Sequence, residues 1–349
     1  MTARRALPIV AAALLAAPSA AASPGARTAA PARACDRAAS VSGQDSAPGT
    51  MSRPFRTIHR LLRALRPGET GCLLGGTFVE NVSIARGGRP RARVTLRSAP
   101  GTRARVAGYV VIRDSANYVT FAHVDVDGHD VTPITVHVYG DDAILSDLNV
   151  TNRDKRNDTY TGSCILLGRH GAPTFRALVE KSRIHDCGSS GHDHGIYAEF
   201  PRAAIIRDNY IYDSPGYGIS MYPDAQSTFV TRNVIDGNGH GNVTFSGEQA
   251  GGEYPQDMAS SRNVLTRNVI ANARTRYNVE SFFPSLSPVG NTVTFNCVWN
   301  APWGNFGYTS GYDRARNIER NPLYVDRRSK DYRLQPGSPC RGMGPAVPP

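Results

Sequence analysis

The chain has 349 residues, a formal net charge of +11 and 40% hydrophobic residues. This length is enough for one large domain or two small ones. One apolar stretch near the N-terminus is too short to span a bilayer, and no second long apolar run follows it, so the sequence argues against an integral membrane protein.

The N-terminal residues 1–22 combine Arg4 and Arg5 with an apolar run and the small-residue stretch PSAAAS. This pattern is typical of a secretory signal peptide. We predict a disordered leader over residues 23–34 and an exported, monomeric protein without a membrane or nucleic-acid partner. The basic charge of an exported protein suits an acidic polysaccharide, a cell wall or a nucleic acid, and of these we favour the polysaccharide.

Arginine supplies nearly all of the basic charge, because the chain has only three lysines. Seven arginines between Arg86 and Arg105, with no acidic residue among them, form the densest basic patch. The sequence leaves two interpretations open, a solvated rim and a track for a polyanion.

Six cysteines without a CxxC pair, in an exported chain, indicate three disulfides rather than a metal site. Fifteen pairings exist in principle. We favour pairing of neighbours in sequence: Cys35 with Cys72, Cys164 with Cys187 and Cys297 with Cys340. Cys164 and Cys187 are 23 residues apart, about one repeat of the pattern described next.

The central part of the chain repeats a pattern of three short strands. Ile196 to Ile219 spans 23 residues, Ile219 to Val243 spans 24, and Val243 to Val279 spans 36 because of an inserted loop. A period in the twenties with β-rich runs and no helical periodicity predicts a solenoid. Equivalent asparagines recur at one bend, where we expect left-handed backbone and stacked amides: Asn209, Asn233, Asn268 and Asn296.

Three strands per coil with an asparagine bend resembles the right-handed parallel β-helix of the pectate-lyase superfamily. This resemblance covers residues 40–340 and implies an all-β fold with a β-helix over 81–310. Residues 35–80 would be a cap whose apolar helical face closes the first coil, formed by Phe55, Ile58, Leu61, Leu62 and Leu65. Residues 311–349 resemble the closing segment of such proteins.

Alternation along the first strand of each coil separates the core from the surface. We expect Ile196, Ala198, Ile219, Met221, Val243 and Phe245 to point inward. We expect His137, Tyr139, Tyr197, Glu199, Ser220, Tyr222, Thr244 and Glu280 to point outward. The superfamily usually binds its substrate on this outer face, so the resemblance places the stretch HDHGIYAEF, residues 192–200, in a groove where His194, Tyr197 and Glu199 are partly exposed.

The resemblance implies an enzyme that cleaves an acidic, uronate-containing polysaccharide by β-elimination. This reaction needs a base, an acid and a group that neutralises the carboxylate. Our catalytic candidates are His194 as base, Tyr197 or Tyr222 as acid, and Glu199 as an orienting group. Our substrate-binding candidates are His137, Arg169, His192, Asp193, His240, Arg276 and Glu280.

Several alternatives remain open. The same scaffold hosts carbohydrate-binding proteins, hydrolases and epimerases, and polar residues on a solenoid face also serve solubility. The RxPxxR pattern of the superfamily's lyases is absent, and only GHG at Gly239–Gly241 resembles a polygalacturonase motif. Glu199 and Glu280, three coils or roughly 14 Å apart, are too distant for a paired-carboxylate hydrolase.

Two groups of residues raise the question of metal binding. Asp186, Asp213 and Asp236 are expected to stack in register after the third strand, where they would either cap their own turns or bind Ca²⁺. The His192 and His194 pair has no third zinc ligand in view. We therefore assign no metal ligand and keep Ca²⁺ as the alternative.

Overall fold

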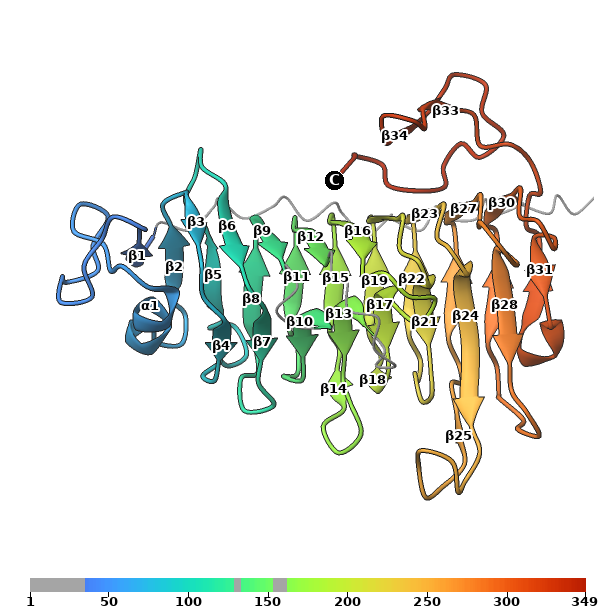
Figure 1. The fold of residues 1–349 in the computed structure, drawn as a ribbon, viewed down its shortest axis with the longest axis horizontal. Helices are drawn as coiled ribbons and strands as arrows, with labels where there is room; N and C mark the ends of the chain where they lie inside the picture. Colours follow the sequence, from blue (N-terminus) through green and yellow to red (C-terminus); the bar gives the residue numbers. More distant parts are fainter. Residues whose placement is uncertain (1–34, 129–132, 153–161) are drawn as a thin grey trace, which may run out of the picture. The chain divides into compact units, whose positions relative to one another are not determined.

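The computed structural model describes residues 35–128, 133–152 and 162–349. The predicted signal peptide and leader lie outside these residues. Residues 34–349 form one compact unit. Within it, three parallel sheets follow one another around each coil, and Figure 1 shows the coils stacked along one axis from blue to red. The protein is therefore a parallel β-helix, as predicted.

Sheet A contains β1 (Arg37–Ala39), β2 (Thr70–Leu73), β5 (Val94–Ser98), β8 (Val119–Ala122), β11 (Ile144–Ser146), β15 (Leu178–Glu180), β19 (Ile205–Arg207), β22 (Phe229–Thr231), β26 (Val264–Thr266), β29 (Thr292–Thr294) and β32 (Asp313–Ala315).

Sheet B contains β3 (Thr77–Phe78), β6 (Ala104–Ala107), β9 (Val124–Asp127), β12 (Asn149–Asn152), β16 (Arg183–Cys187), β20 (Tyr210–Tyr212), β23 (Val234–Asp236), β27 (Val269–Ala271) and β30 (Cys297–Trp299).

Sheet C, the first sheet of each predicted repeat, contains β4 (Val82–Ile84), β7 (Val110–Ile112), β10 (Ile134–Val138), β13 (Ser163–Leu167), β17 (His194–Ala198), β21 (Tyr217–Met221), β24 (Gly241–Glu248), β28 (Val279–Phe282) and β31 (Phe306–Gly307).

The remaining elements lie outside the three sheets: α1 (Ile58–Ala64), β14 (Thr174–Phe175), β18 (Pro201–Arg202), β25 (Met258–Ala259), the 3₁₀ helix η1 (Thr309–Gly311), β33 (Tyr324–Asp326) and β34 (Asp331–Leu334). The parallel sheets begin at β1 and end at β32, so they extend beyond the predicted limits 81 and 310 at both ends.

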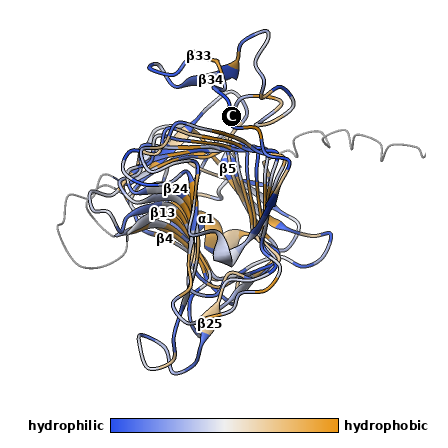
Figure 2. Cartoon of the chain, turned by 90° about the vertical axis from the view of Figure 1, so that its right-hand side faces the viewer, coloured by the Kyte–Doolittle hydropathy of each residue, from blue (hydrophilic) through white to orange (hydrophobic). Residues whose placement is uncertain are grey.

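The core fills the inside of the coils. All six residues predicted to point inward from sheet C are fully buried there. Helix α1 contacts β1, β2 and β4, and its Ile58 and Leu61 join the same core, so it covers the open first coil as predicted. Figure 2 looks along the coils and shows α1 inside their cross-section.

The asparagine bend carries a ladder of side-chain amides. Asn209 Nδ2 donates to Asn233 Oδ1 at 3.0 Å, and each later rung donates to the next, through Asn268 and Asn296 to Asn317. Our prediction of stacked amides is confirmed. The prediction of left-handed asparagines is wrong, because the residue before each asparagine has the positive φ: Asp208, Arg232, Arg267, Phe295 and Arg316.

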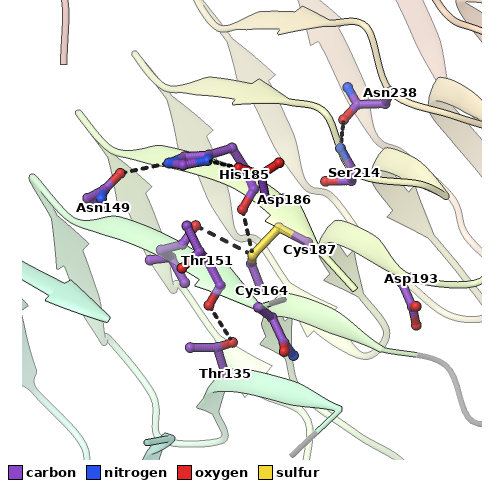
Figure 3. The surroundings of a disulfide bond; sticks show 12 residues. Thr135, Asn149, Thr151, Cys164, His185, Asp186, Cys187, Asp193, Ser214 and Asn238 are labelled. Carbon is purple, nitrogen blue, oxygen red and sulfur yellow. Dashed lines mark hydrogen bonds and ion pairs between the residues drawn. A yellow bond between two sulfur atoms is a disulfide. The ribbon is translucent and has the colours of Figure 1, made fainter. Parts of the chain in front are cut away.

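All three predicted disulfides are present. Cys164 and Cys187 have their Cα atoms 5.2 Å apart and join β13 to β16, as Figure 3 shows. The Cys297–Cys340 bridge ties the C-terminal segment, residues 321–349, to sheet B. This segment therefore packs along the outer side of sheet B, with Tyr324 and Tyr332 against Tyr210.

The predicted aspartate row is not in register. Tyr212, not Asp213, pairs with Asp236, so Asp236 lies one position earlier than Asp186 and Asp213. The Asp236 carboxylate is buried against Arg327 Nε at 2.7 Å, and Asp213 lies 2.5 Å from Lys330 Nζ. Two of the three carboxylates thus pair with cations of the C-terminal segment, which removes the repulsion that favoured Ca²⁺.

The predicted basic patch is interrupted by ion pairs. Arg103 contacts both Asp125 and Asp147, and Arg105 pairs with Asp127. These acidic residues come from later coils, so two of the seven arginines in the run are paired with carboxylates.

Candidate functional site

The outer face of sheet C carries the predicted site residues in two rows. Strand register aligns His137, Leu166, Tyr197, Ser220, Thr244 and Glu280 on successive coils. Glu199 and Tyr222 each follow the paired residues Ala198 and Met221, so they occupy equivalent places on neighbouring coils. The predicted assignment of these side chains to one face is therefore confirmed.

Glu199 lies in a half-buried environment beside Tyr254, whose hydroxyl donates to Oε1 at 3.2 Å. Burial raises the pKa of the Glu199 carboxyl to about 7, and the charge of Glu253 adds to this effect. The Tyr254 hydrogen bond, a backbone hydrogen bond from His170 and the charge of Arg169 act in the opposite direction. Glu199 can thus gain or lose a proton near neutral pH.

Two tyrosines flank Glu199 on the same face. The rings of Tyr197 and Tyr222 stack with centroids 6.5 Å apart and an interplanar angle of 10°. The Tyr222 hydroxyl donates to Glu248 Oε2 at 2.5 Å. Burial raises the pKa of both phenols above the ordinary value, so both are proton donors at neutral pH.

A cation and a neutral histidine lie next to this group. The guanidinium of Arg169 lies 4.9 Å from the centre of the Tyr139 ring, and Arg169 itself is exposed. His137 Nδ1 lies 3.0 Å from the Tyr139 hydroxyl. Burial lowers the pKa of His137 to about 4, with Arg169 and Arg113 contributing, so this ring is uncharged at neutral pH.

His194 and Tyr197 are both buried, contrary to our prediction that they are partly exposed. The exposed fraction of His194 is 6% and that of Tyr197 is 9%, because the rings of Tyr197 and Tyr217 pack against His194 with centroids 5.6 Å away. His194 also has the same parity in β17 as the inward residues Ile196 and Ala198, so the prediction of an exposed His194 disagreed with strand alternation. Glu199 is partly exposed, and Ile196 and Ala198 are buried, as predicted.

The hydrogen bonding of His194 argues against its predicted role as base. Nδ1 accepts the backbone N–H of Tyr217 at 3.0 Å. Burial, together with the charges of His192 and His240, lowers the pKa of His194 to about 3. Because Nδ1 accepts a hydrogen bond, the neutral ring carries its proton on Nε2 and can only donate from there.

The Asp193 side chain is bound to backbone groups of the protein and does not face solvent. Its carboxylate accepts the backbone N–H groups of Gly162, Ser189 and Ser190 at 2.7 to 2.8 Å, and the residue is buried. It therefore holds the turn that precedes β17. His192 is exposed on this turn, and the described residues contain no group of three His, Cys, Asp or Glu side chains arranged for a metal ion.

The other predicted binding residues form a second cluster. Arg276 Nη2 donates to Glu280 Oε2 at 3.0 Å, and Arg276 Nη1 lies 3.2 Å from His240 Nε2. The Tyr217 hydroxyl also donates to Glu280, which is only 1% exposed. Glu280 is thus occupied by its neighbours. Tyr197 lies between this cluster and Glu199, since its ring contacts those of both His194 and Tyr222.

Three residues of this site were not predicted from the sequence: Tyr217, Glu248 and Tyr254. Tyr217 begins β21 and has the parity of the core residue Ile219, so alternation did not point to it; its hydroxyl contact with Glu280 and its ring contact with His194 bring it to the site. Glu248 is the last residue of β24, and Tyr254 lies in the inserted segment between β24 and β28, where β25 pairs antiparallel with β24. The 36-residue spacing from Val243 to Val279 was the available signal, because it marked an insertion beside the groove.

Two open cavities lie against sheet B. One cavity of about 180 Å³ is lined by Arg105, Asp127, Asn149 and His185, among others. Its polar groups already pair with one another: Arg105 with Asp127, and His185 Nε2 with Asn149 Oδ1 at 3.0 Å (Figure 3). A larger one lies beneath the C-terminal segment. The outer face of sheet C is therefore the better candidate, an open face with ionisable groups of shifted pKa.

Comparison with known proteins agrees with the fold. The fold places this protein in the class of parallel β-helix proteins, and its sheet C has a polar outer face. Residues 134–319 match the family model described as a right handed beta helix region, which covers more than half of the chain. The chain belongs to this family, and its coils are right-handed. No curated protein matches the sequence.

Solved structures share the fold at low sequence identity. A complex of XylC with xylose has a TM-score of 0.61 at 10% identity and covers 82% of this chain and 70% of its own. Pectate lyase Pel9A has a TM-score of 0.59 at 13% identity, covering 90% and 88%. A lacto-N-biosidase of Eubacterium ramulus has a TM-score of 0.60 at 13% identity, covering 80% and 59%. At these identities the likeness shows the fold alone.

The part of the chain that the structure describes contains no helix long and apolar enough to cross a membrane.

Proposed function

We propose that the protein is a secreted, monomeric enzyme that cleaves an acidic, uronate-containing polysaccharide by β-elimination on the outer face of sheet C. Glu199 carries the proposal, because this face holds a carboxyl group with a pKa of about 7 between phenol donors and an exposed arginine. Three disulfides support secretion. The likeness in fold to a pectate lyase supports this choice of substrate class.

Each part of the reaction has a side chain suited to it. Arg169 neutralises the uronate carboxylate, which stabilises the enolate-like intermediate. The Glu199 carboxylate takes the proton from the carbon next to the carboxylate. The bond from the adjacent carbon to the glycosidic oxygen then breaks, a carbon–carbon double bond forms, and the Tyr222 hydroxyl protonates the leaving oxygen.

The base differs from the one expected from the sequence. His194 accepts a hydrogen bond at Nδ1 and is buried, so it positions Tyr217 and the neighbouring ring of Tyr197 rather than taking a proton. Glu199 is partly exposed, and the raised pKa makes its carboxylate a stronger base than an ordinary glutamate.

Hydrolysis is the second candidate reaction, and the carboxyl groups near Tyr222 favour it. The charges of Glu199, Glu248 and Glu253 all raise the pKa of Tyr222, so three carboxyl groups converge on one phenol. In this alternative the protonated Glu199 is the general acid, and Glu248 activates water. A third outcome, binding without cleavage, would mean that the face serves recognition only.

The pH dependence of cleavage separates the first two candidates. As a base Glu199 must be ionised, so the elimination rate rises as the pH increases through about 7. As a general acid Glu199 must be protonated, so the hydrolysis rate falls over the same interval. The assay screens pectate, alginate and glycosaminoglycans and records both the absorbance of the unsaturated product and new reducing ends.

Two variants test the assignment. Glu199→Gln should lose at least about 100-fold in kcat, the usual contribution of a general acid or base. Glu253→Gln is the matched control: it removes a charge that raises the Glu199 pKa, so the inflection of the rate–pH curve should move to lower pH, while kcat falls far less than in Glu199→Gln. Full activity of Glu199→Gln on a cleaved substrate would reject the proposal.

The cation is tested separately. Because Arg169 supplies the neutralising charge, we expect cleavage to persist in a chelator and to fall in Arg169→Ala mainly through kcat. Loss of activity in the chelator, restored by Ca²⁺, would transfer this role to a metal ion.

A further inference from the structure

Two aromatic side chains are exposed at the last coil on the sheet C side. Trp303 is 57% exposed and Tyr308 is 54% exposed, which is unusual for side chains of this size. Tyr277 contacts both rings edge-on, with centroid distances of 5.8 Å to Trp303 and 5.6 Å to Tyr308. We call Tyr277, Trp303 and Tyr308 the aromatic platform.

The platform is held in place by its surroundings. The guanidinium of Arg276 lies 5.2 Å from the Trp303 ring centre and 5.6 Å from that of Tyr308. The Trp303 backbone N–H donates to the Arg276 carbonyl at 3.3 Å. The Tyr277 ring covers Gly307, where an added Cβ would lie 2.2 Å from it. Gly307 pairs with Glu280, so the platform lies on the outer face of sheet C.

The charge of Arg276 is already balanced. Its Nη2 donates to Glu280, which is buried, so the cation fixes the rings and is not free for an anion. Within the described residues, the Trp303 indole N–H and the Tyr308 hydroxyl have no hydrogen-bond partner. The platform therefore presents apolar ring faces with polar groups at their edges. A pyranose ring has the matching form, with a C–H face and a rim of hydroxyl groups.

The platform is continuous with the proposed catalytic face. Arg276 contacts His240, the His240 ring lies 5.0 Å from that of Tyr217, and Tyr217 contacts His194. Strand pairing places β31 four coils from β17, or about 19 Å at the usual strand spacing. An extended polysaccharide can span this distance, whereas a short oligosaccharide at Glu199 cannot.

We propose that the aromatic platform is a distal sugar-binding subsite, which stacks one pyranose ring of the chain being cleaved at Glu199. The subsite recognises the ring face and not a carboxylate, so its contribution to affinity does not depend on salt. The identity of the bound chain as substrate rests on the proposed function, but binding at the platform does not require cleavage.

Binding is measured by calorimetry on the folded full-length protein, with long and short fragments of each polysaccharide in the screen. Trp303→Ala and Tyr308→Ala should each weaken the binding of long fragments about tenfold, or 1.4 kcal/mol, at both low and high salt. Affinity for short fragments should not change. Trp299→Ala is the control, since Trp299 is 37% exposed on sheet B and should leave all affinities as they are.

Fluorescence gives an independent signal, because Trp299 and Trp303 are the only tryptophans. Long fragments should alter the emission of Trp299→Phe, in which Trp303 is the only tryptophan, and should not alter that of Trp303→Phe. Melting curves and sedimentation of each variant exclude unfolding and a change of mass.

The outcomes separate this inference from the proposed function. Platform-dependent binding without cleavage would support the subsite and reject the enzyme. Cleavage with wild-type affinity in both Trp303→Ala and Tyr308→Ala would support the enzyme and overturn the subsite. No binding to any fragment, or a change of mass in the platform variants in place of a change in affinity, would also overturn the subsite.

Discussion

At the scale of single residues, two histidines close together in the sequence have very different environments. His194 and His192 lie two residues apart, yet the first is buried against aromatic rings and the second is exposed. His194→Ala leaves the Tyr217 N–H without its acceptor, so we expect a loss of about 1 to 3 kcal/mol in the free energy of unfolding. His192→Ala, the matched control, should change it by less than about 0.5 kcal/mol. Denaturant titration measures both, and equal stability of the two variants would contradict this assignment.

At the scale of elements, two adjacent residues with different roles form each coil corner at the asparagine bend. One residue takes the left-handed conformation, and the asparagine after it bonds to the neighbouring coils. Asn233→Ala removes an amide that accepts from Asn209 and donates to Ile206 and Asn268, so we expect a loss of about 3 kcal/mol. Asn317→Ala, at the half-buried end of the ladder, should lose about 1 kcal/mol. Thermal or denaturant unfolding measures both variants. Equal losses of unfolding free energy in Asn233→Ala and Asn317→Ala would contradict the larger contribution expected of an interior asparagine.

At the scale of the whole molecule, the C-terminal segment stabilises the outer side of sheet B. Arg327 is the countercharge of the buried Asp236 carboxylate, so Arg327→Ala leaves that charge without its cation. Because Arg327 is itself half exposed, we expect a loss of about 2 to 3 kcal/mol, below the value for a fully buried pair. Faster proteolysis of the segment should accompany it. Arg328→Ala, at an exposed position next to Arg327, is the control, and a similar loss there would contradict the role of the ion pair.

The sequence by itself determined the repeating architecture of this protein. A period of 23 to 24 residues sets which residues of successive coils lie side by side, and alternation within a strand sets which of them face inward. Ile196 and Ile219, for example, pair and are both buried as predicted. The Cys164–Cys187 bridge follows from the same periodicity, because one coil brings the two residues together. These features depend on local spacing, which the sequence displays directly.

Only the tertiary structure decided how the outer faces are covered. Tyr254 reaches Glu199 from an insertion 55 residues further along the chain, and Arg327 reaches Asp236 across 91 residues. The path of such a segment depends on its own turns and on packing against distant coils, and neither has a repeat in the sequence. For the same reason the pKa of Glu199 could not be predicted, since desolvation depends on every group nearby in space and not on neighbours in sequence.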